Sequence, residues 1–235
     1  PASDEILYSN YTRHKARQVE SVERCLKQLK ERFGKDELCL ALTGSGSKNL
    51  ADQLGIPYVQ EVVANSIAIR RKFRNVSTAI ELGGQDAKVL FFKRDPATGA
   101  LSVSDMRMNG SCAGGTGAFL DEVASILRVP SNELNALAAQ GETVYDISGR
   151  CGVYAKTDIL PLLNQGVSKS NLALSAFHAV AKQTIGGLAQ GLTIKGPVIF
   201  EGGPMTFEPE LIRVFAKRLD LEKEDTLIPD HPETM

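Results

Sequence analysis

The chain has 235 residues, of which 43% are hydrophobic and 23% are charged, and its 27 basic and 28 acidic side chains leave a formal net charge of -1. This mix is typical of a globular protein and excludes a disordered or collagen-like chain. Because there is no basic excess, the composition gives no sign of binding to nucleic acid or to an anionic membrane surface. The sequence has no apolar run of membrane-spanning length and no signal peptide, which predicts a cytoplasmic protein that does not contact a membrane.

Residues 1–75 are expected to form a first α/β lobe. The alternating apolar residues of 5–12 predict an edge strand, and the short apolar run 38–42, which leads into small residues, predicts a buried strand. Apolar residues at helical spacing predict three helices, at 17–33, 48–54 and 61–73.

Residues 76–235 are expected to form the second lobe. It opens with a predicted antiparallel meander of three strands, at 77–82, 87–92 and 101–108. A later buried strand is predicted at 196–200. Helices are predicted at 113–127, 131–140, 154–163, 169–192 and 209–219.

Paired glycines follow two of these predicted strands, as Gly83-Gly84 and as Gly202-Gly203. Glycine lets the backbone approach a ligand closely and present its N–H groups, which a phosphate requires, although each pair also suits a simple tight turn. Two such sites favour a nucleotide. Beside the first pair, the amide of Gln85 can orient an attacking water, and the carboxylate of Asp86 can hold Mg²⁺ through water.

The four cysteines are too few for a secreted disulfide framework. Cys25 lies on the apolar stripe of a predicted helix and Cys39 lies in a predicted buried strand, so both are expected to be core thiols. Cys112 and Cys151 each precede a predicted helix, where the positive end of the helix dipole favours an anion. Thiolates are ligands of soft metals and iron–sulfur clusters, and two symmetric chains would supply four of them. Two structural cysteines or a redox disulfide would fit the same residues.

Five segments of the sequence form a combined pattern: ELGGQD at 81–86, NGSCAGGTG at 109–117, CGVYAKTD at 151–158, NQG at 164–166 and FEGG at 200–203. Together they resemble a known family, the activator ATPases of 2-hydroxyacyl-CoA dehydratases, which is also the family of the ATPase subunits of benzoyl-CoA reductase. The resemblance extends over nearly the whole chain, and the 39-residue separation of Cys112 and Cys151 agrees with the spacing of that family.

The resemblance implies an α/β fold of the actin-like ATPase type (ribonuclease H-like, shared by acetate and sugar kinases, Hsp70 and actin) with two lobes. It further implies a homodimer that holds one [4Fe-4S] cluster through Cys112 and Cys151 of each chain. By the same resemblance, hydrolysis of ATP to ADP reorients the helices behind the cysteines. The cluster then passes one low-potential electron to a CoA-ester dehydratase or reductase, and a donor such as ferredoxin or flavodoxin supplies the next electron.

Residue by residue, the resemblance puts the turn at 83–85 against the β- and γ-phosphates and Asp86 beside the metal or the attacking water. It puts Gly202 and Gly203 on the adenosine side. It also implies that Gly115, Thr116 and Gly117 begin the helix behind the cluster, with their backbone close to the nucleotide.

Two departures from the family accompany the resemblance. Glu81 stands where the family commonly has aspartate, which leaves its role in hydrolysis open. Nothing before Glu5 corresponds to the family's N-terminal phosphate-binding hairpin, and a closing helix is missing after 231–233. We therefore expect a fragment, truncated at both ends, that binds ATP weakly on its own.

Two other functions fit the same residues. One is an actin-like small-molecule kinase that uses its cysteines only for packing. The other is a non-catalytic docking domain of a larger protein. The polar residues at 156–158 are expected to cap and solvate the helix that follows Cys151, with partner docking or an electron path as the alternative.

Overall fold

The computed structural model describes residues 5–14, 17–109 and 114–234. The chain divides into two compact units, Pro1–Lys72 and Phe73–Met235. Among the described residues, no helix is both long enough and apolar enough to cross a lipid bilayer.

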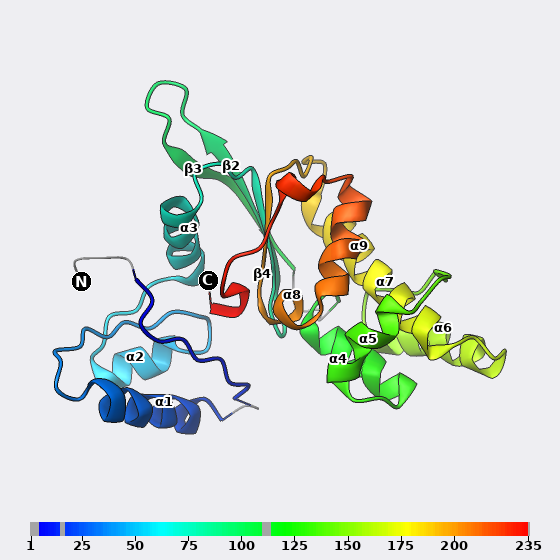
Figure 1. Ribbon diagram of the computed structural model, residues 1–235, viewed down its shortest axis with the longest axis horizontal. Coiled ribbons are helices and arrows are strands. Elements are labelled where there is room, and N and C mark those ends of the chain that lie inside the picture. Colours follow the sequence, from blue (N-terminus) through cyan, green and yellow to red (C-terminus); the bar gives the residue numbers. More distant parts are fainter. Residues whose placement is uncertain (1–4, 15–16, 110–113, 235) are drawn as a thin grey trace. The chain divides into compact units, whose positions relative to one another are not determined.

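The first unit contains three helices, α1 (Gln18–Phe33), α2 (Lys48–Leu54) and α3 (Glu61–Lys72) (Figure 1). All three predicted helices are therefore confirmed, to within one residue at each end. Helix α1 is amphipathic in sequence but has no buried residue, and Cys25 on it is only half-buried. The expectation of a core thiol at Cys25 is thus not met.

The two predicted strands of this unit are wrong. Residues 5–12 form no strand, and the run 38–42 contributes a single parallel bridge, between Leu42 and Tyr58. Leu38 and Leu40 are 47% and 40% exposed, and Cys39 is exposed rather than buried. A strand forms only where another strand offers a ladder of hydrogen bonds, and among the described residues the partner backbone is the short stretch at 57–59.

The second unit is built on a five-stranded mixed sheet in the order β3-β2-β1-β4-β5 (Figure 1). β1 (Thr78–Leu82) pairs antiparallel with β2 (Ala87–Arg94), which pairs antiparallel with β3 (Leu101–Met108). The predicted meander is confirmed.

On its other edge β1 pairs in parallel with β4 (Val198–Glu201), which is followed in the sheet by the short β5 (Thr226–Leu227). In the β1–β4 register Glu81 lies opposite Glu201. The carboxyl ends of β1 and β4 therefore meet at one edge of the sheet, which brings the two glycine pairs together.

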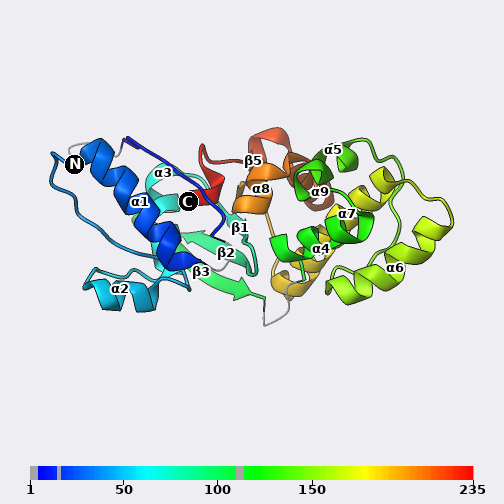
Figure 2. The ribbon, with the colours of Figure 1, turned by 90° about the horizontal axis from the view of Figure 1, so that it is seen from below.

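The helices that form the core with the sheet lie together on one side of it in both views (Figures 1 and 2). Side chains alternate along a strand, so Ile80 and Leu82 of β1 face these helices and are fully buried among Phe119, Phe177 and Phe215. The helices are α4 (Gly117–Leu127), α5 (Leu134–Ala139), α6 (Gly152–Asn164), α7 (Lys169–Ala189) and α9 (Pro209–Leu219).

Each of these five helices was predicted, and only their ends differ. Helix α4 begins at Gly117 rather than at 113, and α7 ends at Ala189 rather than at 192, where Gln190 turns left-handed. The predicted helix at 131–140 starts as a 3-10 turn, η1 (Ser131–Glu133), ahead of α5. Short elements without a hydrophobic period were missed: α8 (Gly203–Phe207), β5, η2 (Lys223–Asp225) and η3 (Pro232–Thr234).

Candidate functional site

The turn from β1 to β2 carries the first glycine pair. It is closed by the Gly83 N–H, which donates to the carbonyl oxygen of Asp86 at 2.8 Å. Gly84 and Gln85 are exposed, whereas Gly83 and Asp86 are half-buried. A Cβ atom added at Gly84 would meet no atom within 4 Å, so this turn presents its backbone to open space.

The second glycine pair lies against the first at the end of β4. Gly202 has a φ of +94°, and a Cβ atom there would lie 2.0 Å from the carbonyl oxygen of Leu82, so no other residue fits. Its N–H donates to the carbonyl of Pro232 at 2.8 Å and is therefore used within the fold. Gly203 is the first residue of the short helix α8.

Helix α4 is hydrogen-bonded to the glycine turn by its first residues. The N–H groups of Gly117 and Ala118 donate to the carbonyls of Gly83 and Gly84 at 3.0 and 2.8 Å. A Cβ atom at Gly117 would lie 3.1 Å from Pro204 and 3.3 Å from the Gly83 carbonyl. The turn, the start of α4 and the start of α8 therefore converge at the carboxyl ends of β1 and β4.

Asn109 ties the beginning of the glycine-rich segment to the same turn. Its backbone N–H and side-chain Oδ1 bind the carbonyl and the N–H of Ala87 at 3.0 and 2.8 Å, and its Nδ2 donates to the carbonyl of Gln85 at 3.4 Å. The segment 109–118 thus begins and ends on the turn between β1 and β2. Cys112, which was predicted as a metal ligand, lies within this segment but outside the described residues.

The described part of this segment packs against α7 and against the loop before Cys151. Gly115 has a φ of +75°, and a Cβ atom there would lie 2.9 Å from the Thr184 hydroxyl of α7. Thr116, which precedes α4, is fully buried. A Cβ atom at Gly114 would lie 2.2 Å from the carbonyl oxygen of Arg150. The backbone two residues after Cys112 therefore touches the backbone one residue before Cys151.

Cys151 is the N-cap residue of α6, and its thiol is free and half-buried. The loop that carries it is held closely on both sides. A Cβ atom at Gly149 would lie 2.4 Å from the Ala179 carbonyl of α7, and one at Gly152 would overlap the Glu122 carboxylate of α4. The predicted position of this cysteine at a helix start is confirmed.

Metal ligands do not gather elsewhere in the part of the chain that the structure describes. No group of three His, Cys, Asp or Glu side chains in 5–14, 17–109 and 114–234 is placed to hold a metal ion.

Two buried charged groups next to the turn were missed by sequence reasoning. Lys88 is 3% exposed and pairs with the Glu81 carboxylate at 3.0 Å, and Glu201 is 1% exposed on the same face of the sheet. The carboxylate of Glu81 is therefore engaged with a buried lysine beside the turn. The hairpin register, which sets Glu81 opposite Lys88, could have revealed this pair.

Glu208, between α8 and α9, is another buried acid that the sequence did not reveal. Burial raises the pKa of its carboxyl group, with a further contribution from the charge of Asp121 on α4, to about 7. No periodic pattern marks this residue, because it belongs to the junction of two helices.

A hollow of about 220 Å³ lies away from the glycine turns. It is lined by the loop residues 144–147 and by side chains of α7 and α9, among them His178 and Arg218. It contains none of the predicted nucleotide-binding residues.

Residues 4–224 match the sequence profile of the BadF/BadG/BcrA/BcrD ATPase family. The chain belongs to this family. The resemblance drawn from the motifs is thereby confirmed.

Among its relatives in the BadF/BadG/BcrA/BcrD family, the (R)-2-hydroxyglutaryl-CoA dehydratase activating ATPase of Acidaminococcus fermentans is 30% identical over 72% of this chain and 62% of its own length. The 2-hydroxyisocaproyl-CoA dehydratase activator of Clostridioides difficile is 27% identical over 83% of this chain and 68% of its own. The chain thus spans about two thirds of the length of these relatives.

Solved structures agree with the family. Component A of the (R)-2-hydroxyglutaryl-CoA dehydratase of Acidaminococcus fermentans superposes with a TM-score of 0.77 at 26% identity, over 90% of this chain and 78% of that one. The activator of the 2-hydroxyisocaproyl-CoA dehydratase from Clostridium difficile, with bound ADPNP, gives 0.76 at 26% identity, over 90% and 75%. The fold is the actin-like ATPase fold, as predicted.

Proposed function

We propose that this chain is the ATP-dependent activator of a CoA-ester dehydratase or of a related reductase, and that it works as a homodimer in the cytoplasm. Membership of an ATPase family and the names of its relatives support the activator role. Each dimer would hold one [4Fe-4S] cluster through Cys112 and Cys151 of both chains. A ferredoxin or flavodoxin would supply its electrons.

One observation carries this proposal: the contact of Gly114 with Arg150. It joins the segments of both cysteines in front of the neighbouring helices α4 and α6, which pack together. Cys151 stands at the N-terminus of α6, where the free N–H groups and the helix dipole would stabilise the thiolate that a cluster ligand requires. When bound, the cluster would supply a single electron at low potential. The residues of the chain would orient it and separate it from the nucleotide.

The same segment supports a link between the nucleotide and the cysteines. Both of its ends are hydrogen-bonded to the turn at 83–87, which we propose as the site of the β- and γ-phosphates. A displacement of this turn would therefore move Asn109 and the start of α4 together. Gln85 and Asp86 would orient the attacking water and hold Mg²⁺, and Gly202 and Gly203 would line the adenosine side.

Anaerobic reconstitution with iron and sulfide tests the proposal. We expect about four irons per dimer and a reduced-state EPR signal, both lost in Cys112→Ser and in Cys151→Ser. Cys25→Ser and Cys39→Ser are matched controls, because these thiols belong to the first unit and should not change the iron content. A folded dimer that contains no iron after reconstitution would contradict the proposed cluster site. Phosphoryl transfer to a small acceptor by that dimer would favour a kinase.

A further inference from the structure

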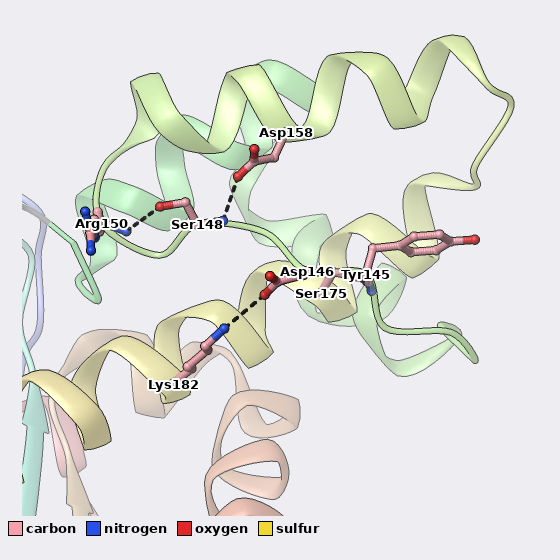
Figure 3. A network of polar contacts seen from close by, with 7 residues as sticks. All are labelled: Tyr145, Asp146, Ser148, Arg150, Asp158, Ser175 and Lys182. Carbon is pink, nitrogen blue, oxygen red and sulfur yellow. Dashed lines mark hydrogen bonds and ion pairs between the residues drawn. The ribbon is translucent and has the colours of Figure 1, made fainter.

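The segment at 141–150, which leads to Cys151, contains no helix or strand, and side chains of the following helices hold its backbone. Asn171 of α7 accepts the N–H groups of Glu142 and Thr143 at 2.9 and 3.2 Å. Ser175 of α7 accepts the N–H of Tyr145 at 2.9 Å (Figure 3). Tyr145 is half-buried, and a backbone N–H that is shielded from water needs such a partner; this segment finds its partners in side chains rather than in a sheet.

The last of these bonds comes from α6, the helix that Cys151 caps. Asp158 accepts the N–H of Ser148 through Oδ2 at 2.8 Å, and Figure 3 shows its carboxylate directed at that backbone nitrogen. The Ser148 hydroxyl in turn accepts the N–H of Arg150 at 3.4 Å. Asp158 therefore fixes the backbone three residues before Cys151 to the helix that begins directly after it.

Its two polar neighbours do not share this contact. The Thr157 hydroxyl donates to the Tyr154 carbonyl within the helix, and Lys156 is exposed. The ion pair of Asp146 with Lys182, at 3.0 Å, holds the same segment, but both side chains are largely exposed, at 89% and 60%. An exposed pair of this kind contributes little to rigidity, whereas a carboxylate bound to a backbone N–H makes a short, directional bond.

We infer that Asp158 is a positioning residue for Cys151: its bond to the Ser148 N–H sets where the thiol stands at the start of α6. The inference rests on the proposed function, in which Cys151 is a cluster ligand. A ligand held by a bond outside the cluster reaches the metal in one orientation, which is how outer contacts tune metal sites. The role requires an oxygen at the Oδ2 position and does not require its charge.

Alkylation of the iron-free, reduced full chain with iodoacetamide tests this. Mass spectrometry follows Cys151, with the exposed Cys39 of the same molecule as the internal reference. We expect Asp158→Ala to raise the rate at Cys151 at least about threefold with no change at Cys39, because the freed loop opens more often. Asp158→Asn, which keeps the acceptor oxygen, should stay within about twofold of the unchanged chain, as should the matched control Asp146→Asn.

Asp158→Glu separates position from charge, because it keeps the carboxylate but moves it by one methylene. Asp158→Glu should raise the alkylation rate at Cys151 as Asp158→Ala does. If Asp158→Ala does not fold, Asp158→Glu replaces it in the test. In reconstituted dimers, the EPR line shape should change in Asp158→Ala and be restored in Asp158→Asn.

The inference is overturned if Asp158→Ala leaves both the Cys151 rate and the EPR line shape unchanged, or if Asp158→Asn behaves as Asp158→Ala does. Failure of the unchanged chain to bind iron would count against the proposed function instead. The alkylation rates would still decide whether Asp158 positions the thiol.

Discussion

The carboxyl group of Glu208 is buried at the junction of α8 and α9, and its Oε2 finds no hydrogen-bond partner among the described residues. Burial, and after it the charge of Asp121, raises its pKa from 4.5 to about 7. The folded chain therefore keeps this proton in a pH range where the unfolded chain has already lost it. Stability must fall as the pH rises from about 4.5 through 7, and the full penalty is present above that range.

We expect Glu208→Gln, which cannot ionise, to remove this pH dependence. At pH 8 the variant should be more stable than the unchanged chain by about 1–2 kcal/mol, less than the full pKa difference implies because solvent screens part of the carboxyl charge. At pH 4 the two should differ little. Urea unfolding at both pH values measures this difference in the free energy of unfolding. Glu224→Gln, at an exposed glutamate, is the control. An equal difference at pH 4 and pH 8 would contradict the prediction.

The variant Gly84→Ala tests the proposed contact between the turn at 83–86 and the phosphates. Because a Cβ atom added there meets nothing within 4 Å, Gly84→Ala should leave the free energy of unfolding nearly unchanged. The methyl group would nevertheless occupy the space in which we place the phosphates, so ATP should bind at least about tenfold more weakly. Isothermal titration calorimetry measures the affinity.

Gly46→Ala is the matched control for Gly84→Ala, since Gly46 also has open space around it but lies in the first unit. Equal ATP affinity in Gly84→Ala and Gly46→Ala would contradict the proposal that the turn at 83–86 contacts the nucleotide.

At the scale of elements, the approach of β4 to β1 depends on a glycine. Gly202→Ala would set a Cβ atom 2.0 Å from the Leu82 carbonyl and would keep a φ of +94°, so the two strand ends would have to separate. Gly166 has a similar φ of +84° but open space around it. We expect Gly166→Ala to cost about 1 kcal/mol and Gly202→Ala at least about 3 kcal/mol, measured by urea unfolding.

Gly166→Ala carries only the cost of a positive φ. The difference between the two variants in the free energy of unfolding therefore measures the cost of the clash with the Leu82 carbonyl. If both cost the same, the strand ends are not in the contact that the β1–β4 register describes.

Asn109 joins another pair of elements, the end of β3 and the turn between β1 and β2. Asn109→Ala leaves the Ala87 N–H without its side-chain acceptor and should cost about 1–2 kcal/mol. Asn109→Asp keeps an oxygen at that position and should cost less than half as much. Thermal unfolding ranks the two variants, and the reverse order would contradict the prediction.

Over the whole molecule, local patterns predicted the helices of both units and the meander of the second. They failed at 5–12 and 38–42, because an apolar run shows that a segment can pair and does not show that a partner is present. The position of Cys151 ahead of α6 followed from local signals, since a helix start is a local event.

The candidate site was predicted residue by residue but not in its arrangement. That Gly83 and Gly202 follow strands is visible in the sequence, whereas their meeting requires β1 and β4 to pair in parallel. The contact of Gly114 with Arg150 likewise depends on the packing of α4 on α6 and α7. Glu208 became a perturbed acid only through burial, which no short pattern encodes.

The place of β1 in the sheet also sets an order of events as the chain folds. On one side β1 pairs with β2, which follows after a short turn, and on the other with β4, in which Val198 lies opposite Thr78, 120 residues away. Local contacts close fast and distant ones slowly, so we expect the meander to form first and one edge of β1 to stay unpaired until β4 arrives. A chain still emerging from the ribosome would present that bare edge to its neighbours until β4 is made. The two glycine pairs meet only when β4 has paired, so a nucleotide bound between them, as we propose, would stabilise the finished fold and could not help to start it.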